Sequence, residues 1–202
     1  MLRIDRKTIF CVALVVMAIS ASAFAGPVSV TIASFADPSI GASEPLFTIN
    51  YDTHRINGSW SGTGMTLEVP VAGLTYENAT FVMDELVIPD NPSELGYYTT
   101  NGGSEIRFFA EGIEVMKIEF NKMWVEGRDS GLDADDAYSD GVTISGIGIG
   151  VLKEESFGFT FANTESNGVF NATASFTSSA VPEPATMAIL ALGGLMLRRR
   201  RK

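Results

Sequence analysis

Cysteine and histidine are almost absent from this chain of 202 residues, which contains one of each. Cys11 lies in an N-terminal segment that we expect to be removed, so the mature protein has no thiol for a disulfide bond or for thiolate chemistry. Any site built on histidine would have to use His54, which we expect to lie in a loop without a catalytic role. These absences exclude zinc sites with two histidine ligands and disulfide-linked scaffolds, and they leave packing as the source of stability.

Basic residues are also scarce between the two ends of the chain. Residues 26–181 contain 6 of the 14 basic residues and 22 of the 24 acidic residues, so their net charge is −16. A surface of this charge repels nucleic acid and anionic lipid, and it attracts divalent cations and basic partners. Nucleic-acid binding is therefore excluded. The length of this body predicts one domain, because it is too short for two domains of ordinary size.

The first 25 residues have the three parts of a secretory signal peptide. Met1–Lys7 is basic, residues 8–20 are mainly apolar, and Ala23 and Ala25 are the small residues that signal peptidase requires at positions −3 and −1. The apolar run is shorter than a membrane span, and a cleavage motif follows it directly. We therefore predict that residues 1–25 form a signal helix, which signal peptidase removes after Ala25.

The end of the chain combines a proline motif, an apolar run and a basic cluster. The prolines of the motif prevent a helix from extending backwards, so we expect a hydrophobic helix over residues 185–197. Such a helix reaches only about 20 Å, against about 30 Å of hydrocarbon in a bilayer. The basic cluster should stay in the cytoplasm, because charges next to a span resist translocation. The motif consists of Val181, Pro182, Glu183 and Pro184, and the basic cluster of Arg198, Arg199, Arg200, Arg201 and Lys202.

This order of motif, apolar run and terminal arginines resembles the PEP-CTERM sorting signal of bacteria, over residues 181–202. The resemblance implies that an exosortase, a membrane protease, cuts near the motif and passes the protein toward the cell surface or the exopolysaccharide matrix. It also implies that the tail holds the protein at the inner membrane before that cut. Tails of this kind are also described as the C-terminal domain of an ice-binding protein, which does not make the body an ice-binding module.

The body has the sequence pattern of an all-β protein, with short β-branched and aromatic runs between Gly, Asn, Asp and Pro. The clearest alternation predicts a hairpin near its end, with the turn at Asn167-Gly168. We predict a single antiparallel β-sandwich or jelly-roll-like domain over residues 26–176, and a polar linker over 177–180 that gives a protease access to the motif. The inward residues of the hairpin are Phe157, Phe159, Phe161, Phe170, Ala172, Ala174 and Phe176; other strands are expected at 28–35, 46–51, 65–71, 79–88, 105–111, 113–124 and 142–152.

Two of these strands support further predictions. In the strand over 113–124, alternation places Met116, Ile118 and Phe120 in the core. In the strand over 142–152, three alternating glycines from Gly146 to Gly150 should leave one face bare for a close approach.

Five aspartates gather in one short segment of the body. Calcium prefers about six to eight oxygen ligands, and the millimolar calcium outside a cell would fill even a weak site. The spacing departs from the EF-hand loop, because Ala134 stands where that loop requires glycine. A bound calcium ion and a solvated acidic loop therefore both stay open. The five residues are Asp129, Asp133, Asp135, Asp136 and Asp140.

Two further kinds of site are possible on residue type alone. Tyr97 and Tyr98 could stack on a sugar ring, although paired aromatic residues are also ordinary packing. A hydrolase that uses two carboxylates needs no histidine, but its acids must lie about 5–10 Å apart across a cleft. The candidate acids are Asp84, Glu85, Glu105, Glu111, Glu114 and Glu119.

The leading interpretation is a non-enzymatic, exported protein that acts structurally or adhesively at the cell surface or in the extracellular matrix. Its expected partners are signal peptidase, an exosortase and exopolysaccharide, and its only expected cofactor is calcium. The alternatives are a carbohydrate-binding or calcium-dependent module and a two-carboxylate hydrolase.

Overall fold

The structure, a computed structural model, describes residues 29–38, 45–89, 98–100, 102–126, 131–135, 138, 140–166 and 169–182. The predicted signal helix over 1–25 and the predicted hydrophobic helix over 185–197 lie outside these ranges. Among the residues described, no helix is long and apolar enough to cross a membrane.

Antiparallel strands make up nearly all of the regular structure in these ranges. The elements are β1 (Val30–Phe35), β2 (Phe47–Asn50), β3 (Arg55–Trp60), β4 (Leu67–Val69), the 3-10 helix η1 (Pro70–Ala72), β5 (Leu74–Tyr76), β6 (Thr80–Val87), β7 (Tyr98–Thr99), β8 (Ser104–Ala110), β9 (Ile113–Phe120), β10 (Trp124–Glu126), β11 (Gly131–Asp135), β12 (Thr143–Gly146), β13 (Leu152–Ser166) and β14 (Val169–Pro182).

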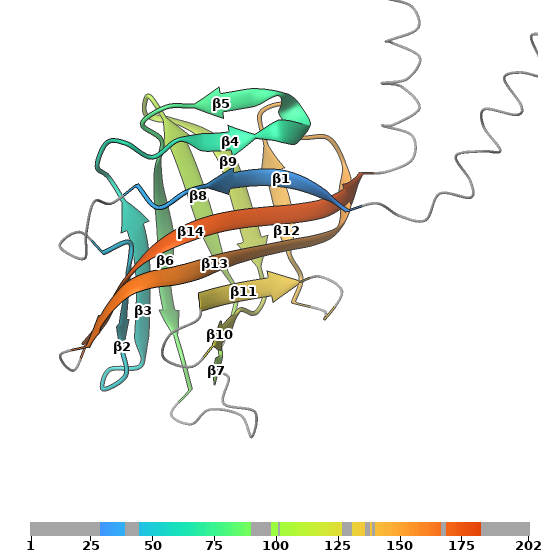
Figure 1. The fold of residues 1–202 in the computed structure, drawn as a ribbon. Coiled ribbons are helices and arrows are strands. Elements are labelled where there is room, and N and C mark those ends of the chain that lie inside the picture. Colours follow the sequence, from blue (N-terminus) through green and yellow to red (C-terminus); the bar gives the residue numbers. More distant parts are fainter. Residues whose placement is uncertain are drawn as a thin grey trace, which may run out of the picture.

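The strands form two layers that lie face to face (Figure 1). One layer has the order β12-β9-β8-β6-β3-β2, and the other contains β5, β4, β1, β14, β13, β11, β10 and β7 as successive neighbours. β14 joins them, because Val169–Ala172 pairs with β2 while Phe176–Ala180 pairs with β1. The predicted all-β class with antiparallel pairing is confirmed.

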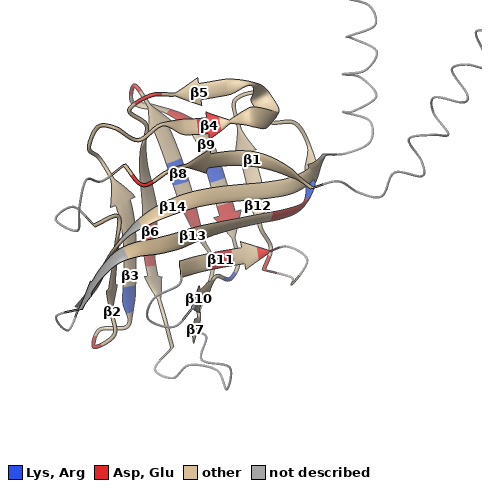
Figure 2. Cartoon of the chain, in the orientation of Figure 1, with Lys and Arg blue, Asp and Glu red and all other residues tan. Residues whose placement is uncertain are grey.

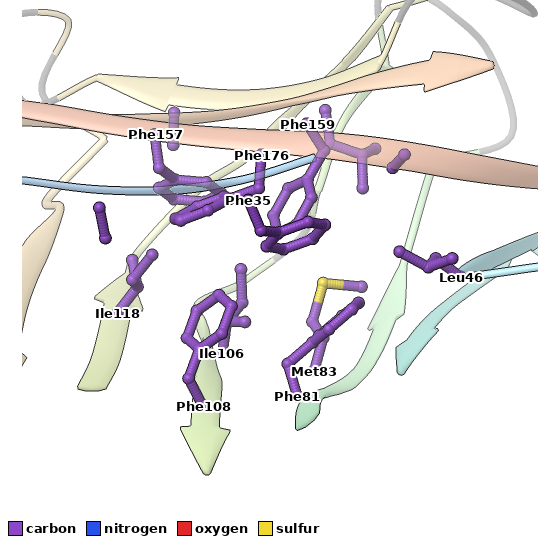
Figure 3. Close-up of a cluster of buried hydrophobic side chains, with 14 of the residues drawn as sticks. Phe35, Leu46, Phe81, Met83, Ile106, Phe108, Ile118, Phe157, Phe159 and Phe176 are labelled. Atoms are coloured by element: carbon purple, nitrogen blue, oxygen red, sulfur yellow. The ribbon is translucent and has the colours of Figure 1, made fainter. Parts of the chain in front are cut away.

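A cluster of phenylalanine rings fills the space between the layers. Phe35, Phe159 and Phe176 of one layer meet Phe81 and Phe108 of the other (Figure 3). The ring centroids lie between 5.0 Å apart, for Phe159 and Phe176, and 6.4 Å apart, for Phe35 and Phe108. All five side chains are buried. Their burial removes large apolar areas from water and supplies the main stabilisation of a domain without disulfide bonds.

The alternation near the end of the body predicts the strand faces correctly. Phe157, Phe159 and Phe161 are buried on β13, and Ala172, Ala174 and Phe176 are buried on β14. On β9, the predicted core residues Met116, Ile118 and Phe120 are also buried. Each set follows the two-residue period of a strand with one face against the core.

The single strand predicted over residues 142–152 is wrong, because the chain turns within it. β12 ends at Gly146, and the Ile149 N–H donates a hydrogen bond to the Gly146 carbonyl oxygen at 3.2 Å. Gly148 has φ of +74°, a conformation that glycine adopts without steric cost. β13 begins after this turn, at Leu152. The glycines therefore serve the turn, and they do not form the bare strand face that the alternation predicts.

The polar segment predicted as a linker, residues 177–180, is instead part of β14. It pairs with β1 on one side and with β13 on the other. Ala180 is fully buried and Ser178 nearly so. The Ser178 hydroxyl accepts a hydrogen bond from the Ala33 N–H at 3.1 Å and donates one to the Ala33 carbonyl oxygen at 3.2 Å. The serine is therefore satisfied inside the sheet, which is why its polarity does not indicate a solvated segment.

A bulge in β13 turns one carboxylate toward the other layer. The register with β14 shifts between Lys153 and Ser156, and Glu154 lies in the left-handed region with φ of +51°. The next residue, Glu155, is buried, and its carboxylate accepts a hydrogen bond from the Ile144 N–H of β12. This contact ties β13 to the edge strand of the opposite layer.

Candidate functional site

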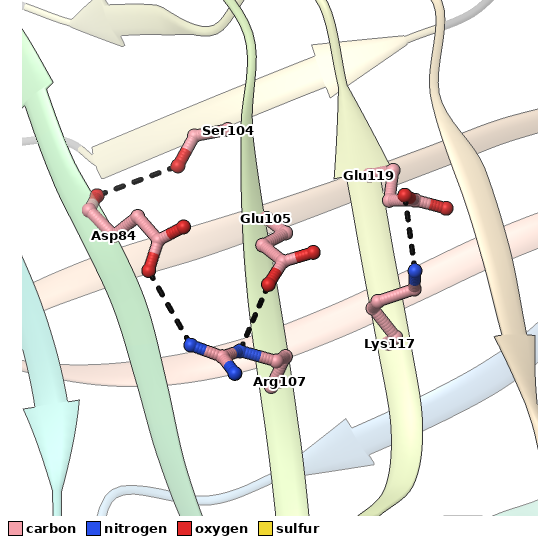
Figure 4. A network of polar contacts seen from close by, with 6 residues as sticks. All are labelled: Asp84, Ser104, Glu105, Arg107, Lys117 and Glu119. Carbon is pink, nitrogen blue, oxygen red and sulfur yellow. Dashed lines mark hydrogen bonds and ion pairs between the residues drawn. The ribbon is translucent and has the colours of Figure 1, made fainter.

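The outer face of strands β6, β8 and β9 carries a ladder of charged side chains (Figure 4). On β8, Ile106 and Phe108 point into the core, so Glu105 and Arg107, which alternate with them, point outward. β9 presents Lys117 and Glu119 in the same way, and β6 presents Asp84 beside them. Figure 2 shows the few basic positions of the layer, on β3, β8 and β9, among more numerous acidic ones.

The strand register places like charges directly opposite each other. Glu105 pairs with Glu119, and Arg107 pairs with Lys117. Pairs of this kind are destabilising unless opposite charges lie close by. Arg107 Nε contacts Glu105 Oε1 at 3.0 Å and its Nη2 contacts Asp84 Oδ1 at 3.5 Å, while Lys117 Nζ contacts Glu119 Oε1 at 3.0 Å. The ladder is therefore held by ion pairs along and across the strands.

The carboxylates around Lys117 change the pKa of its ammonium group. The hydrogen bond that the Lys117 ammonium donates to Glu119 is the largest cause that raises the pKa of Lys117 above its ordinary value, and the charges of Glu119, Glu105 and Glu114 raise it further. A raised pKa keeps the ammonium charged up to strongly alkaline pH, and the stabilisation that its ion pair provides is lost as the pH rises past that value. Because the pair is exposed, its contribution to stability is small.

A shallow groove of about 590 Å³ lies along this face. Three carboxylates line it together with hydroxyl, amide and backbone groups, so the groove offers many hydrogen-bond acceptors and a few donors. It is open to solvent and mainly polar, unlike the enclosed apolar pockets that hold most small ligands. The lining residues are Asp84, Gly103, Ser104, Glu105, Glu119, Phe120, Asn121, Gly141 and Thr143.

Three of the six acids considered for a two-carboxylate hydrolase thus meet in one groove. Asp84, Glu105 and Glu119 line it, whereas Glu85 pairs with Arg55 at 2.6 Å. Glycosidases separate the roles of their two acids by placing one of them in a desolvated pocket. The carboxylates of this groove instead face solvent and contact basic side chains. The arrangement suits binding of a hydroxyl-rich or basic surface better than acid catalysis.

The second candidate region is the end of β14, where the proline motif begins. Val181 pairs with Lys153 and Pro182 with Leu152, so the first two residues of the motif belong to the sheet. Proline has no N–H to donate, which suits it to the end of a strand.

The model of one protein family, the PEP-CTERM protein-sorting motif, matches residues 180–202. The chain carries a PEP-CTERM sorting motif.

The PEP-CTERM motif indicates an extracellular protein that an exosortase sorts, after export and transient anchoring in a membrane through the C-terminal tail. Glu183, Pro184 and the basic cluster of this tail lie outside the described residues, as do Ala23 and Ala25 of the predicted signal peptide. No curated protein matches the chain, and no solved structure matches it either.

The aspartates of the predicted calcium site lie in different surroundings. Asp133 and Asp135 are on β11, and Asp129 and Asp136 lie outside the described residues. Asp140 is 2% exposed, and its Oδ2 accepts hydrogen bonds from Trp124 Nε1 at 2.9 Å and from the Asp135 N–H at 3.2 Å. Within the described ranges, no group of three or more acidic, histidine or cysteine side chains is placed to hold a metal ion.

Calcium binding stays a prediction that thermal unfolding tests. If the ion binds to the folded body, a concentration at 100 times its Kd should stabilise the protein by about 2.7 kcal/mol, because a ligand of the native state alone stabilises it by mass action. The measurement is the melting temperature in calcium and in a chelator, with magnesium as the control. Equal melting temperatures in all three solutions would contradict the calcium site.

The predicted sugar-stacking pair is only partly described. Tyr98 lies on β7, half-buried, with its ring centroid 5.7 Å from that of Tyr51, and Tyr97 lies outside the described residues. The Tyr98 ring therefore packs against its own domain on at least one face.

His54, expected in a loop, lies in the turn between β2 and β3 with φ of +55°, and its carbonyl oxygen accepts a hydrogen bond from the Ile88 N–H.

Sequence reasoning did not find the polar residues whose hydrogen bonds connect distant strands of the β-sandwich. Ser178 bonds to Ala33, 145 positions away in the chain, and Glu155 bonds to Ile144 in the opposite layer. Asp140 was considered only as a metal ligand, whereas it accepts a hydrogen bond from Trp124. The signal that could have identified Ser178 is the two-residue period of the strand, which places it on the same face as the buried Phe176 and Ala180.

Proposed function

We propose that this protein is a non-catalytic β-sandwich which its sorting tail delivers to the cell surface or extracellular matrix, where it acts as a structural or adhesive component. The observation that supports this most directly is the groove on the outer face of β6, β8 and β9. It is mainly polar, its carboxylates form ion pairs with Arg107 and Lys117, and six of its nine lining residues lie on strands. A rigid sheet face of this kind suits contact with an extended polymer.

The chemistry of the groove defines the partner that would fit. Carboxylates accept hydrogen bonds from the hydroxyl groups of a polysaccharide, and the amide of Asn121 and the hydroxyl of Thr143 both donate and accept. The same carboxylates attract cationic groups, since the body has a net charge of −16. Exopolysaccharide with many free hydroxyl groups is therefore the partner we propose.

Retention of the exported protein in the matrix tests this proposal. We expect the triple variant Asp84→Asn, Glu105→Gln, Glu119→Gln to bind isolated exopolysaccharide at least about tenfold more weakly, because three charge-assisted contacts are weakened and each is worth about 1.5–3 kcal/mol at most. The measurement is the fraction of protein that co-sediments with the polymer. A control triple variant, Asp52→Asn, Glu68→Gln, Glu77→Gln, makes the same change of charge at exposed positions outside the groove.

Equal binding by the two triple variants and the unchanged protein would contradict adhesion through the groove. The same proteins also separate adhesion from hydrolysis. If the unchanged protein releases reducing sugar from the polymer and the groove variant does not, the two-carboxylate hydrolase is the correct interpretation.

A further inference from the structure

We propose that the fold sets the limit of tail processing: the exosortase cuts no earlier than the bond that follows Pro182, so Thr177–Pro182 remain in the mature protein as the end of β14. The inference rests on the proposed processing of the tail and adds the position of the cut. Hydrolysis of the peptide bond consumes one water molecule, leaves a new carboxylate on the body and gives the released tail a new amino group.

The pairing of β14 carries the inference. Ala180 pairs with Val30 of β1, and Ser179 pairs with Thr31 on one side and with Ser156 of β13 on the other. Beyond them, Val181 and Pro182 are paired with Lys153 and Leu152 of β13. The backbone of this segment is thus part of the ladder up to the second residue of the motif.

Side chains fix the same segment. Ala180 is fully buried and Ser178 is 1% exposed, and the Ser178 hydroxyl accepts a hydrogen bond from the Ala33 N–H and donates one to the Ala33 carbonyl oxygen. The hydroxyl oxygens of Ser156 and Ser179 lie 2.8 Å apart, in a hydrogen bond between β13 and β14. Removing the strand end from the sheet would break these contacts and expose β1 and β13.

A protease that binds its substrate as an extended strand needs free backbone N–H and carbonyl groups on the scissile segment. In β14 the neighbouring strands occupy backbone groups of this segment, because β1 pairs with it as far as Ala180 and β13 as far as Pro182. Bonds inside such a segment are cut only from an opened state, whose population falls with the free energy of local unfolding. The folded body is therefore protected up to Pro182, and the first bond that lies beyond the ladder follows this proline.

The short segment between β14 and the apolar run limits the positions at which the tail can be cut. Glu183 and Pro184 are the two residues between β14 and the apolar run that starts at Ala185. Two extended residues reach at most about 7 Å. A body tethered in this way lies close to the membrane surface, so a membrane protease that acts beyond β14 reaches the Glu183-Pro184 sequence first.

Peptide mapping of the exported protein from cells that contain the exosortase tests the proposal. We expect the C-terminal peptide to end at Pro182 or at a later residue of the tail. A peptide that ends at Val181 or earlier would overturn the inference and leave the proposed sorting intact. A complete tail ending at Lys202 would overturn both, because no processing would have occurred.

Limited digestion of the purified full-length protein with a non-specific protease gives an independent test. We expect cuts after Pro182 to precede cuts within 177–182. Ser178→Glu buries a charge and should speed cleavage within 177–182 at least about tenfold, whereas Thr177→Glu adds the same charge on the exposed face of the strand and should not. Equal cleavage of this segment in both variants and in the unchanged protein would contradict protection by the sheet.

Discussion

A chain that ends at Phe176 is expected not to fold, although the hydrophobic alternation of the sequence ends there. The missing residues 177–182 form the part of β14 that pairs with both β1 and β13. Four of the five residue pairs between β1 and β14 would be lost, and only Phe35 with Phe176 would remain. β4 and β5 attach to the rest of their layer through β1, so they would lose their support as well.

The expected loss of stability exceeds the free energy of unfolding that a domain of this size usually has. Each backbone hydrogen bond contributes about 0.5–1.5 kcal/mol net, and the buried side chains of Ser178 and Ala180 would also be lost. Natural domains are stable by only about 5–15 kcal/mol in total. We therefore expect residues 26–176 to lack a cooperative unfolding transition in urea, measured by circular dichroism.

The control for this experiment is the chain over residues 26–182, which keeps the whole of β14 and omits the tail. It should unfold cooperatively, because the ladder ends at Pro182. If both chains unfold with the same midpoint, residues 177–182 contribute nothing and the strand pairing described above is wrong. If neither chain folds, the tail beyond Pro182 would have to take part in the fold.

The fold class and the long strands could be predicted from the sequence, because they depend on the pattern of apolar and polar residues within each strand. β6, β8 and β9 each alternate over seven or eight residues, and the structure places them close to their expected ranges. The same rule gave the core faces of β13 and β14 around Phe159 and Phe176. A two-residue period needs no knowledge of the partner strand, and this is why these predictions are confirmed.

The short strands could not be predicted in the same way. β3, β5, β7, β10 and β11 were absent from the prediction, and each has six residues or fewer. Their conformation depends on pairing with strands distant in sequence, as for β11, which lies between β10 and β13. Propensity in such segments is weak, so tertiary contacts decide the structure.

The candidate groove was missed for a related reason. Asp84, Glu105 and Glu119 were identified as acids of interest, but only the register of β6, β8 and β9 brings them together. By contrast, the sorting motif was predicted at residues 181–202 and is matched at residues 180–202, because such a linear motif is contained in the order of the residues. What the linear motif does not reveal is that its first two residues belong to a strand.

Replacing Phe159 with alanine should produce the largest loss of stability among single substitutions in the core. Its ring contacts five others, at centroid distances from 4.8 Å for Phe47 to 6.2 Å for Phe35 and Phe157. Phe→Ala in a packed core costs about 3–5 kcal/mol, and we expect the upper end of this range because rings of both layers lose a partner. The measurement is the urea midpoint of the chain over 26–182, with an unchanged m-value.

Phe120→Ala makes the same deletion at a site of comparable burial and serves as the control. Phe120 is 3% exposed and Phe159 is 2% exposed, so the loss of apolar transfer free energy is nearly the same. Phe120 packs against Phe157, with ring centroids 5.3 Å apart, at one side of the cluster rather than at its centre. We expect its cost to be smaller by about 1 kcal/mol, because a cavity at the edge of a core collapses more easily. Equal costs would show that the layers are held by burial alone, without an added contribution from the central position of the Phe159 ring.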